Sequence, residues 1–100
     1  MAYFSSHRQV AKLQDGRLIA KGRMCYITAQ GGWVAINVRV PDLRYIEEVL
    51  HIQVSMLPAI DAILTGPFNK AIWGNVVGMT FYSVVTDNTL CVEVIAIGPP

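Results

Sequence analysis

The side chains best suited to chemistry gather near the middle of the chain, in the stretch DLRYIEEVLH. Within ten positions this stretch holds Asp42, Arg44, Glu47, Glu48 and His51. On a helix, Glu48 and His51 would have the Glu-x-x-His spacing of carboxylate-bridged metal sites. Such sites need a second copy of that motif and further carboxylates, and the chain has only two histidines and no second copy. We therefore expect no metal site.

The residue types used in nucleophilic catalysis form no matching pattern elsewhere. The serines lack the flanking glycines of a nucleophile elbow, and the two cysteines stand in no pattern that marks a thiol nucleophile. The pieces QGGW and WGNVVG contain glycine but lack the lysine and the spacing of a phosphate-binding loop. We expect no catalytic residue, no cofactor and no enzymatic activity.

Period-two alternation explains the central polar stretch better than a helix does, because residues 46–56 alternate as a strand. One face would hold Ile46, Leu50, Ile52, Val54 and Met56, and the other Glu47, Val49, His51, Gln53 and Ser55. Pro41 ends the preceding strand because it has no N–H for the ladder. The sequence VPDLRYIEEV thus predicts a corner between two strands, with Arg44 near enough to pair with Asp42 or with either glutamate.

Further strands follow from the same alternation. Residues 33–40 place Val34, Ile36, Val38 and Val40 on one face, and a glycine turn joins this run to residues 23–29, which predicts a hairpin over 23–40. Asp15-Gly16 predicts a further hairpin with a type I′ turn. Near the C-terminal end, residues 76–85 and 89–98 form two runs that are nearly apolar on both faces. We expect a second sheet to cover them inside and another subunit to cover them outside.

Short strands and frequent turns predict an all-β chain, folded as a single-domain antiparallel β-sandwich over residues 1–100, with a small barrel as the alternative. Pro58 and the Gly66-Pro67 pair limit any helix to a short one near residues 59–64. Residues 1–7 are expected to form a flexible arm or an arm that reaches a neighbouring subunit.

The composition points to burial between subunits. The chain is 53% hydrophobic and only 15% charged, whereas ordinary soluble domains have roughly 45–50% and about 25%. No uncharged run reaches the roughly 20 residues of a membrane-spanning helix, and no secretory signal is visible. Large apolar surfaces usually mark interaction sites, so we expect the excess to be covered in a homo-oligomer.

Charge is distributed unevenly along the chain. Residues 1–40 carry six Lys and Arg side chains against Asp15 alone, whereas residues 41–100 are acidic. The basic residues are spaced apart and lack the interleaved aromatics of single-strand binders, so we do not expect nucleic-acid binding. We expect these opposite charges to meet within the fold or across copies of the protein.

Cys25 and Cys91 lie in apolar strand-like stretches and fit neither metal-ligand spacing nor a dense disulfide framework, so we expect buried free thiols. Aromatic residues beside turns suit either a core or interface role or, alternatively, a site that stacks a ligand ring. We favour an interface, and its candidate residues are Trp33, Trp73, Tyr82, Val92 and Val94.

The order of the pieces GRMCYITA, WVAINVRVP, DLRYIEEV, WGNVVGMTFY and VEVIAIG, over residues 22–98, resembles small β-rich proteins of tailed bacteriophages and marine viruses. The resemblance implies a virion component, either head-decorating or tail-associated, built as a β-sandwich and working as a symmetric homo-oligomer. It supplies no catalytic motif.

The residues and the resemblance lead to one hypothesis. We expect a non-enzymatic structural or assembly protein, located in the virion or in the host cytoplasm during assembly, whose partners are copies of itself, with a trimer favoured, and other virion proteins. The alternative is a small β-sandwich binding module with an aromatic-lined site for a carbohydrate or nucleotide.

Overall fold

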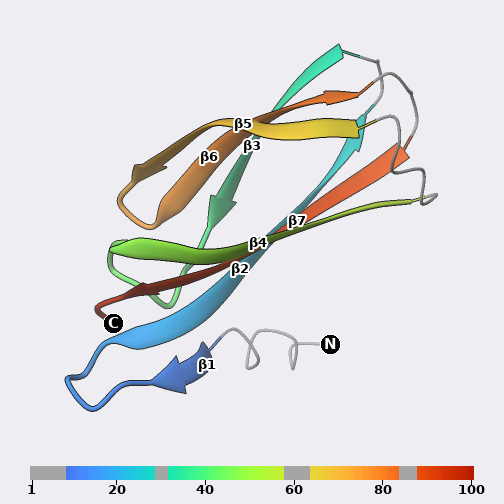
Figure 1. Ribbon diagram of the computed structural model, residues 1–100. Coiled ribbons are helices and arrows are strands. Elements are labelled where there is room, and N and C mark those ends of the chain that lie inside the picture. Colours follow the sequence, from blue (N-terminus) through green and yellow to red (C-terminus); the bar gives the residue numbers. More distant parts are fainter. Residues whose placement is uncertain (1–8, 29–31, 58–63, 84–87) are drawn as a thin grey trace.

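A computed structural model describes residues 9–28, 32–57, 64–83 and 88–100. These residues form seven strands and no helix (Figure 1). The strands are β1 Gln9–Lys12, β2 Leu18–Thr28, β3 Gly32–Arg39, β4 Glu48–Leu57, β5 Leu64–Trp73, β6 Val76–Ser83 and β7 Asn88–Gly98. The predicted all-β class is confirmed. The short helix expected near 59–64 falls outside the described residues except at Leu64, which begins β5, and the N-terminal arm falls outside them entirely.

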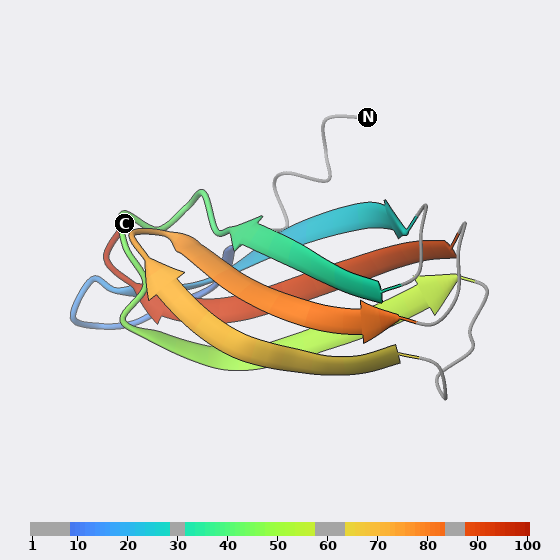
Figure 2. The ribbon, with the colours of Figure 1, turned by 90° about the horizontal axis from the view of Figure 1, so that it is seen from above.

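The strands build two antiparallel sheets, which confirms the predicted sandwich. The four-stranded sheet has the order β1-β2-β7-β4, and the three-stranded sheet has the order β3-β6-β5. Figure 1 shows the three-stranded sheet above the four-stranded one, and Figure 2 shows the same two layers from above. The two runs expected to be covered on both faces, residues 76–85 and 89–98, contain β6 and all but the first residue of β7, the inner strands of their sheets.

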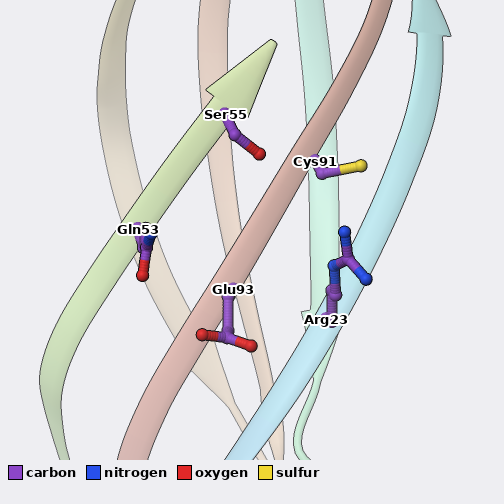
Figure 3. Close-up of a pocket in the computed structure, with 5 residues that line it drawn as sticks. All are labelled: Arg23, Gln53, Ser55, Cys91 and Glu93. Carbon is purple, nitrogen blue, oxygen red and sulfur yellow. The ribbon is translucent and has the colours of Figure 1, made fainter. Parts of the chain in front are cut away.

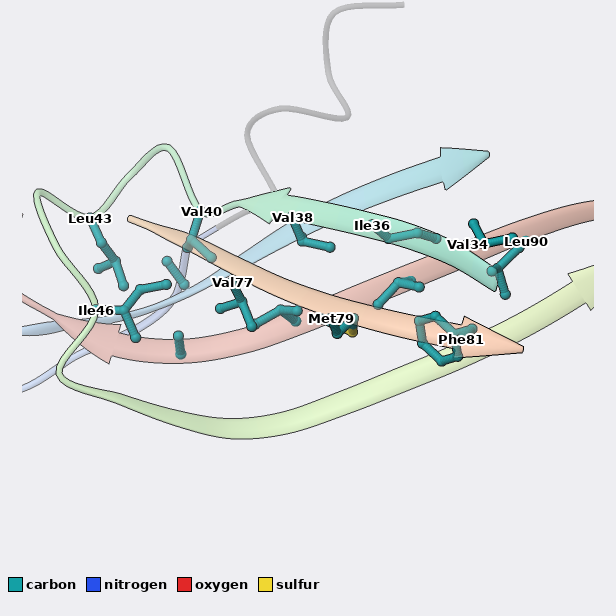
Figure 4. Close-up of a cluster of buried hydrophobic side chains, with 14 of the residues drawn as sticks. Val34, Ile36, Val38, Val40, Leu43, Ile46, Val77, Met79, Phe81 and Leu90 are labelled. Atoms are coloured by element: carbon teal, nitrogen blue, oxygen red, sulfur yellow. The ribbon is translucent and has the colours of Figure 1, made fainter. Parts of the chain in front are cut away.

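The core lies between the facing sides of the two sheets (Figure 4). Alternate side chains of β3, β6 and β7 fill it, as period-two burial requires. Its buried members from these strands are Val34, Ile36, Val38, Val77, Met79, Phe81, Leu90, Val92, Val94 and Ala96. Each large aliphatic or aromatic member contributes roughly 1.5–3 kcal/mol by leaving water. The face predicted for residues 33–40 is therefore confirmed.

The end of β3 crosses close to β2 at Gly22. A Cβ atom at this position would overlap the carbonyl oxygen of Arg39 and lie 3.2 Å from the Cα of Val40. Both neighbours are backbone, so neither can turn aside as a side chain would. Glycine at position 22 thus allows the end of β3 to pass directly over β2.

The hairpin predicted over residues 23–40 is wrong. β2 pairs with β7 along its whole length, from Leu18 opposite Gly98 to Thr28 opposite Asn88, and β3 pairs with β6 in the other sheet. The chain therefore changes sheets between β2 and β3. Alternation identifies the buried face of a strand but does not identify the strand beside it.

The hairpin predicted at Asp15-Gly16 is confirmed, although its turn type is not. β1 pairs with β2, and the turn between them is closed by the Leu13 N–H, which donates to the Arg17 carbonyl at 2.8 Å. A type I′ turn needs positive φ at both central residues, but here Gly16 has a φ of 95° and Asp15 does not have a positive φ. The loop is thus longer than a two-residue turn.

The face predicted for Leu50 is also wrong, because β4 contains a bulge. Val49 is opposite Ala96 in β7 and His51 is opposite Ile95, so Leu50 has no partner between them. The extra residue shifts the alternation by one position. Val49 therefore packs against the core with Ile52 and Val54, whereas Leu50 is 47% exposed.

β5 was not expected from the sequence, because Gly66 and Pro67 suggested a break. The strand accommodates them with a cis peptide bond and two irregularities in its pairing with β6, one on each side of Phe68. β5 is an edge strand of its sheet, which is where proline is tolerated. It joins β6 through a tight turn in which Gly74 has a φ of 60°.

Candidate functional site: an exposed aromatic sheet face

The central polar stretch forms the predicted corner, which spans residues 40–47 in the structure and connects β3 to β4 across the two sheets. Leu43 and Ile46 are buried there. The side-chain amide of Asn75 donates to the Leu43 carbonyl at 3.2 Å, and the Ile46 N–H donates to the Gly74 carbonyl at 2.8 Å. These bonds attach the corner to the turn between β5 and β6. The contacts of the corner therefore have a structural role.

The carboxylates near this corner are held by Arg17 from the first hairpin. Its guanidinium lies 3.1 Å from a carboxylate oxygen of Glu47 and 2.8 Å from one of Asp15. The Glu47 contact is the main cause that raises the pKa of Arg17, and the Arg17 backbone N–H is the main cause that lowers the pKa of Asp15. Glu47 thus pairs with Arg17, a partner that the sequence prediction, built around Arg44, did not include.

Within the described parts of the chain, no group of three or more His, Cys, Asp or Glu side chains is placed to hold a metal ion. The same parts contain no helix that is long and apolar enough to cross a membrane.

The most prominent surface feature is the outer face of the three-stranded sheet. Trp33 on β3 is 67% exposed, an unusual state for the largest side chain. Its ring meets Tyr82 of β6 edge-to-face with 5.2 Å between centroids, and meets Phe68 of β5 in the same manner at 5.7 Å. Tyr82 and Phe68 are themselves 39% and 38% exposed. One aromatic from each strand thus contributes to a cluster that faces outward.

Trp73, at the end of β5, extends this face toward the other end of the sheet. Its ring lies over Gly78 of β6, where a Cβ would overlap the ring and stand 3.0 Å from the Oδ1 atom of Asn37. The Trp73 side chain remains 51% exposed. We use the name aromatic face for the surface that Trp33, Phe68, Tyr82 and Trp73 form together.

The two charged residues on the strands that carry the aromatic face are both positive. The strands of this sheet carry Arg39 and Lys70, both exposed, and no acidic residue. The face therefore combines apolar rings with cations that have no carboxylate on the same sheet.

The five residues predicted for the interface divide into two groups. Trp33, Trp73 and Tyr82 lie on the aromatic face, where a partner can reach them. Val92 and Val94 have no exposed surface and pack between the two sheets, so they hold the subunit together instead. Phe68 was missed because its strand was not recognised.

A second apolar surface lies on the core side of β2. Met24 and Tyr26 point to the same side of the sheet as Leu18 and Ala20, because they are opposite Val92 and Leu90 of β7. They are nevertheless 42% and 45% exposed, whereas Leu18 and Ala20 are buried. The three-stranded sheet thus leaves this part of β2 uncovered.

The expectation of free thiols is wrong, because Cys25 and Cys91 form a disulfide. They are directly opposite each other in the β2–β7 ladder, with Cα atoms 4.0 Å apart, on the outer side of the four-stranded sheet. Their separation of 66 residues in sequence concealed this contact. Only the pairing of β2 with β7 reveals it.

Comparison with known proteins supplies a likeness in fold. No known protein family and no curated protein matches the sequence. Among solved structures, the C-terminal part, residues 323–701, of the R1 pyocin fiber of P. aeruginosa matches with a TM-score of 0.57 and 15% identity. The chain resembles a segment of that fiber in fold. The match covers 84% of this chain but only 24% of the fiber chain, so this chain spans about a quarter of its neighbour.

Proposed function

We propose that the protein is a non-enzymatic structural component of a phage or phage-tail-like particle, and that copies of it associate through the aromatic face. The exposed aromatic face is the observation that carries this proposal. The likeness in fold to a pyocin fiber segment supports the structural class. Other proteins of the particle are further partners in this proposal.

The size of the aromatic face suits an interface. A large aromatic side chain buries about 150–250 Å² when fully covered. The four rings are between 38% and 67% exposed, so together they present roughly 400 Å² of apolar surface. A standard interface takes about 800 Å² from each partner, of which the rings would supply half. Aromatic residues are also the side chains that dominate binding energy at interfaces.

The charges favour a ring of copies over a two-fold dimer. In a two-fold contact the same surface meets itself, which would bring Arg39 and Lys70 of both copies together without a carboxylate on either sheet. In a ring, the aromatic face meets a different surface of the next copy, and that surface can supply acidic residues. The smallest such ring is the trimer.

The test is the solution mass from light scattering, over about a hundred-fold range of concentration and at low and high salt. We expect a stable mass of about three times 11.0 kDa. The variant Trp33→Ser should shift the mass toward one subunit, because it removes the central ring of the cluster. Tyr45→Ser is the matched control, since Tyr45 is an aromatic that is 47% exposed but lies in the corner and not on the three-stranded sheet. Circular dichroism checks that both variants fold.

Two results would refute the proposal. One is a wild-type protein that stays monomeric throughout, and the other is equal dissociation of the Trp33 and Tyr45 variants. A persistent monomer would leave the aromatic face open to a ligand, and a saturable thermal shift with sugars or nucleotides would then support the binding module.

A further inference from the structure

A hollow of about 140 Å³ lies on the outer face of the four-stranded sheet, the sheet that does not carry the aromatic face. Its lining comes from three adjacent strands, β2, β7 and β4 (Figure 3). The lining residues are Arg23, Gln53, Ser55, Cys91 and Glu93. Apart from the half-cystine at position 91, every one of them is polar or charged.

Strand register places these side chains in two rows across the sheet. Glu93 of β7 stands between Arg23 of β2 and Gln53 of β4. In the next row, Cys91 of β7 stands between Cys25 of β2 and Ser55 of β4, and the disulfide joins β2 to β7 at this point. Because β7 is hydrogen-bonded on both sides and cross-linked to β2, the base of the hollow is held rigidly, which lowers the entropy cost of binding.

Several polar groups at the hollow have no partner within the part of the chain that the structure describes. The Arg23 guanidinium, the Gln53 amide and the Ser55 hydroxyl form no hydrogen bond or ion pair there. Glu93 has its carboxylate 4.0 Å from the ammonium of Lys21. The hollow thus offers the Arg23 guanidinium and two neutral polar groups, together with the carboxylate of Glu93.

We propose that this hollow binds a single acidic sugar unit of the uronate type. The planar guanidinium of Arg23 matches a carboxylate with two parallel hydrogen bonds. Sugar hydroxyls both donate and accept, so they suit the amide of Gln53, the hydroxyl of Ser55 and the carboxylate of Glu93. A volume of about 140 Å³ is well below the roughly 300–1,000 Å³ of sites for drug-sized molecules, so the hollow accommodates about one sugar ring at a time.

The composition of the hollow selects against two other ligand classes. No aromatic side chain lines it, so a nucleobase would find no ring on which to stack. A phosphate would bring two negative charges close to Glu93, whereas a uronate brings one charge and several hydroxyls. The proposal therefore concerns a ligand with one carboxylate.

The test is a titration of the whole protein with sodium glucuronate, followed by two-dimensional NMR of the backbone amides. We expect saturable shifts at the lining residues with a dissociation constant in the millimolar range, on the order of 1 mM or weaker. Glucose and acetate are the comparison probes, and each should bind more weakly than glucuronate because each lacks half of the contacts.

Two variants sharpen the titration. Arg23→Gln should weaken glucuronate binding by about tenfold or more, because it removes a charge-assisted pair. Arg44→Gln removes an exposed arginine from the corner and should leave the affinity unchanged. Ser55→Ala should weaken glucuronate but leave acetate unaffected.

Three outcomes would overturn the inference: no saturable shift with glucuronate, equal binding of acetate, or equal losses in the Arg23 and Arg44 variants. The test is separate from that of the aromatic face, because the hollow lies on the other sheet. Trp33→Ser should change the oligomer and keep the glucuronate site.

Discussion

The disulfide between Cys25 and Cys91 makes the sharpest prediction about stability. It closes a loop of 66 residues, and the loss of that constraint from the unfolded chain is worth about 4 kcal/mol at 25 °C. Domains of this size are stable by only about 5–15 kcal/mol, so this single link supplies a large share. We therefore expect the double variant Cys25→Ser, Cys91→Ser to fold but to lose roughly a quarter to four-fifths of its free energy of unfolding.

Urea unfolding followed by circular dichroism measures the loss. With a slope of about 1–3 kcal/mol per molar urea, the midpoint should fall by roughly 2 M, and the melting temperature should fall by about 15–30 °C. Reducing the wild-type protein with dithiothreitol should reproduce both changes, because it removes the same link without changing the sequence. Dithiothreitol should have no effect on the double variant, which is the control.

An unchanged midpoint together with an unchanged melting temperature after reduction would refute the stabilising role of the disulfide. A thiol assay on the unfolded, unreduced protein then separates two causes. Two reactive thiols would mean that the link does not form in solution, whereas none would mean that it forms without stabilising the fold.

Three further predictions test the fold and its electrostatics. Gly22→Ala should destabilise by about 3 kcal/mol or more in urea unfolding, because the added methyl meets fixed backbone, and an unchanged midpoint would refute the close crossing of the sheets. Leu50→Ser should lower the free energy of unfolding by about 1 kcal/mol or less, and Ile52→Ser should lower it clearly more. A larger loss for Leu50→Ser than for Ile52→Ser would place the bulge elsewhere. In an NMR titration, Arg17→Ala should raise the pKa of Asp15 only part of the way to its ordinary value, because the backbone N–H of residue 17 remains. Because folding lowers the pKa of Asp15, its contribution to stability is fully present above the ordinary carboxyl pKa and is lost as the pH falls through the lowered value. A pKa of Asp15 that is the same in the Arg17→Ala variant would exclude a contribution from the Arg17 side chain.

Local patterns predicted the features that depend on local chemistry. Alternation in residues 33–40 identified the buried face of β3, because a strand must bury every second side chain against the other sheet. Pro41 identified the end of that strand and the start of the corner. These inferences need only the residue and its sequence neighbours.

Apart from the turn type at Asp15-Gly16, the wrong predictions depended on partners distant in sequence. β2 pairs with β7, about seventy residues away, and no pattern in residues 23–40 indicates that pairing. The bulge at Leu50 lies in the pairing of β4 with β7, and the disulfide joins residues that are opposite each other in the pairing of β2 with β7. The partner of β2, the bulge in β4 and the disulfide thus all involve pairing with β7, and the sequence of β7 alone does not indicate any of them.

The candidate interface residues likewise divide into those that local patterns predicted correctly and those whose position depends on the fold. Aromatic type and nearby turns led to Trp33, Trp73 and Tyr82, which are exposed. Val92 and Val94 are as apolar as any interface residue, but the second sheet already covers them. Composition therefore indicates that apolar surface is in excess, whereas only the fold distinguishes the part used within the subunit from the part left outside.

The two proposals support each other through the different characters of the two outer sheet faces. If copies associate through the aromatic face, the hollow of each copy remains free to meet a ligand unless the next copy covers it. One sugar unit bound in one hollow with a dissociation constant on the order of 1 mM contributes only about 4 kcal/mol, which is too weak to hold a particle at a surface. Three hollows in one ring, facing a surface with many acidic sugars, can gain a factor of 10² or more without any new contact. Disruption of the ring should therefore reduce attachment to an acidic polysaccharide surface far more than it reduces binding of free glucuronate.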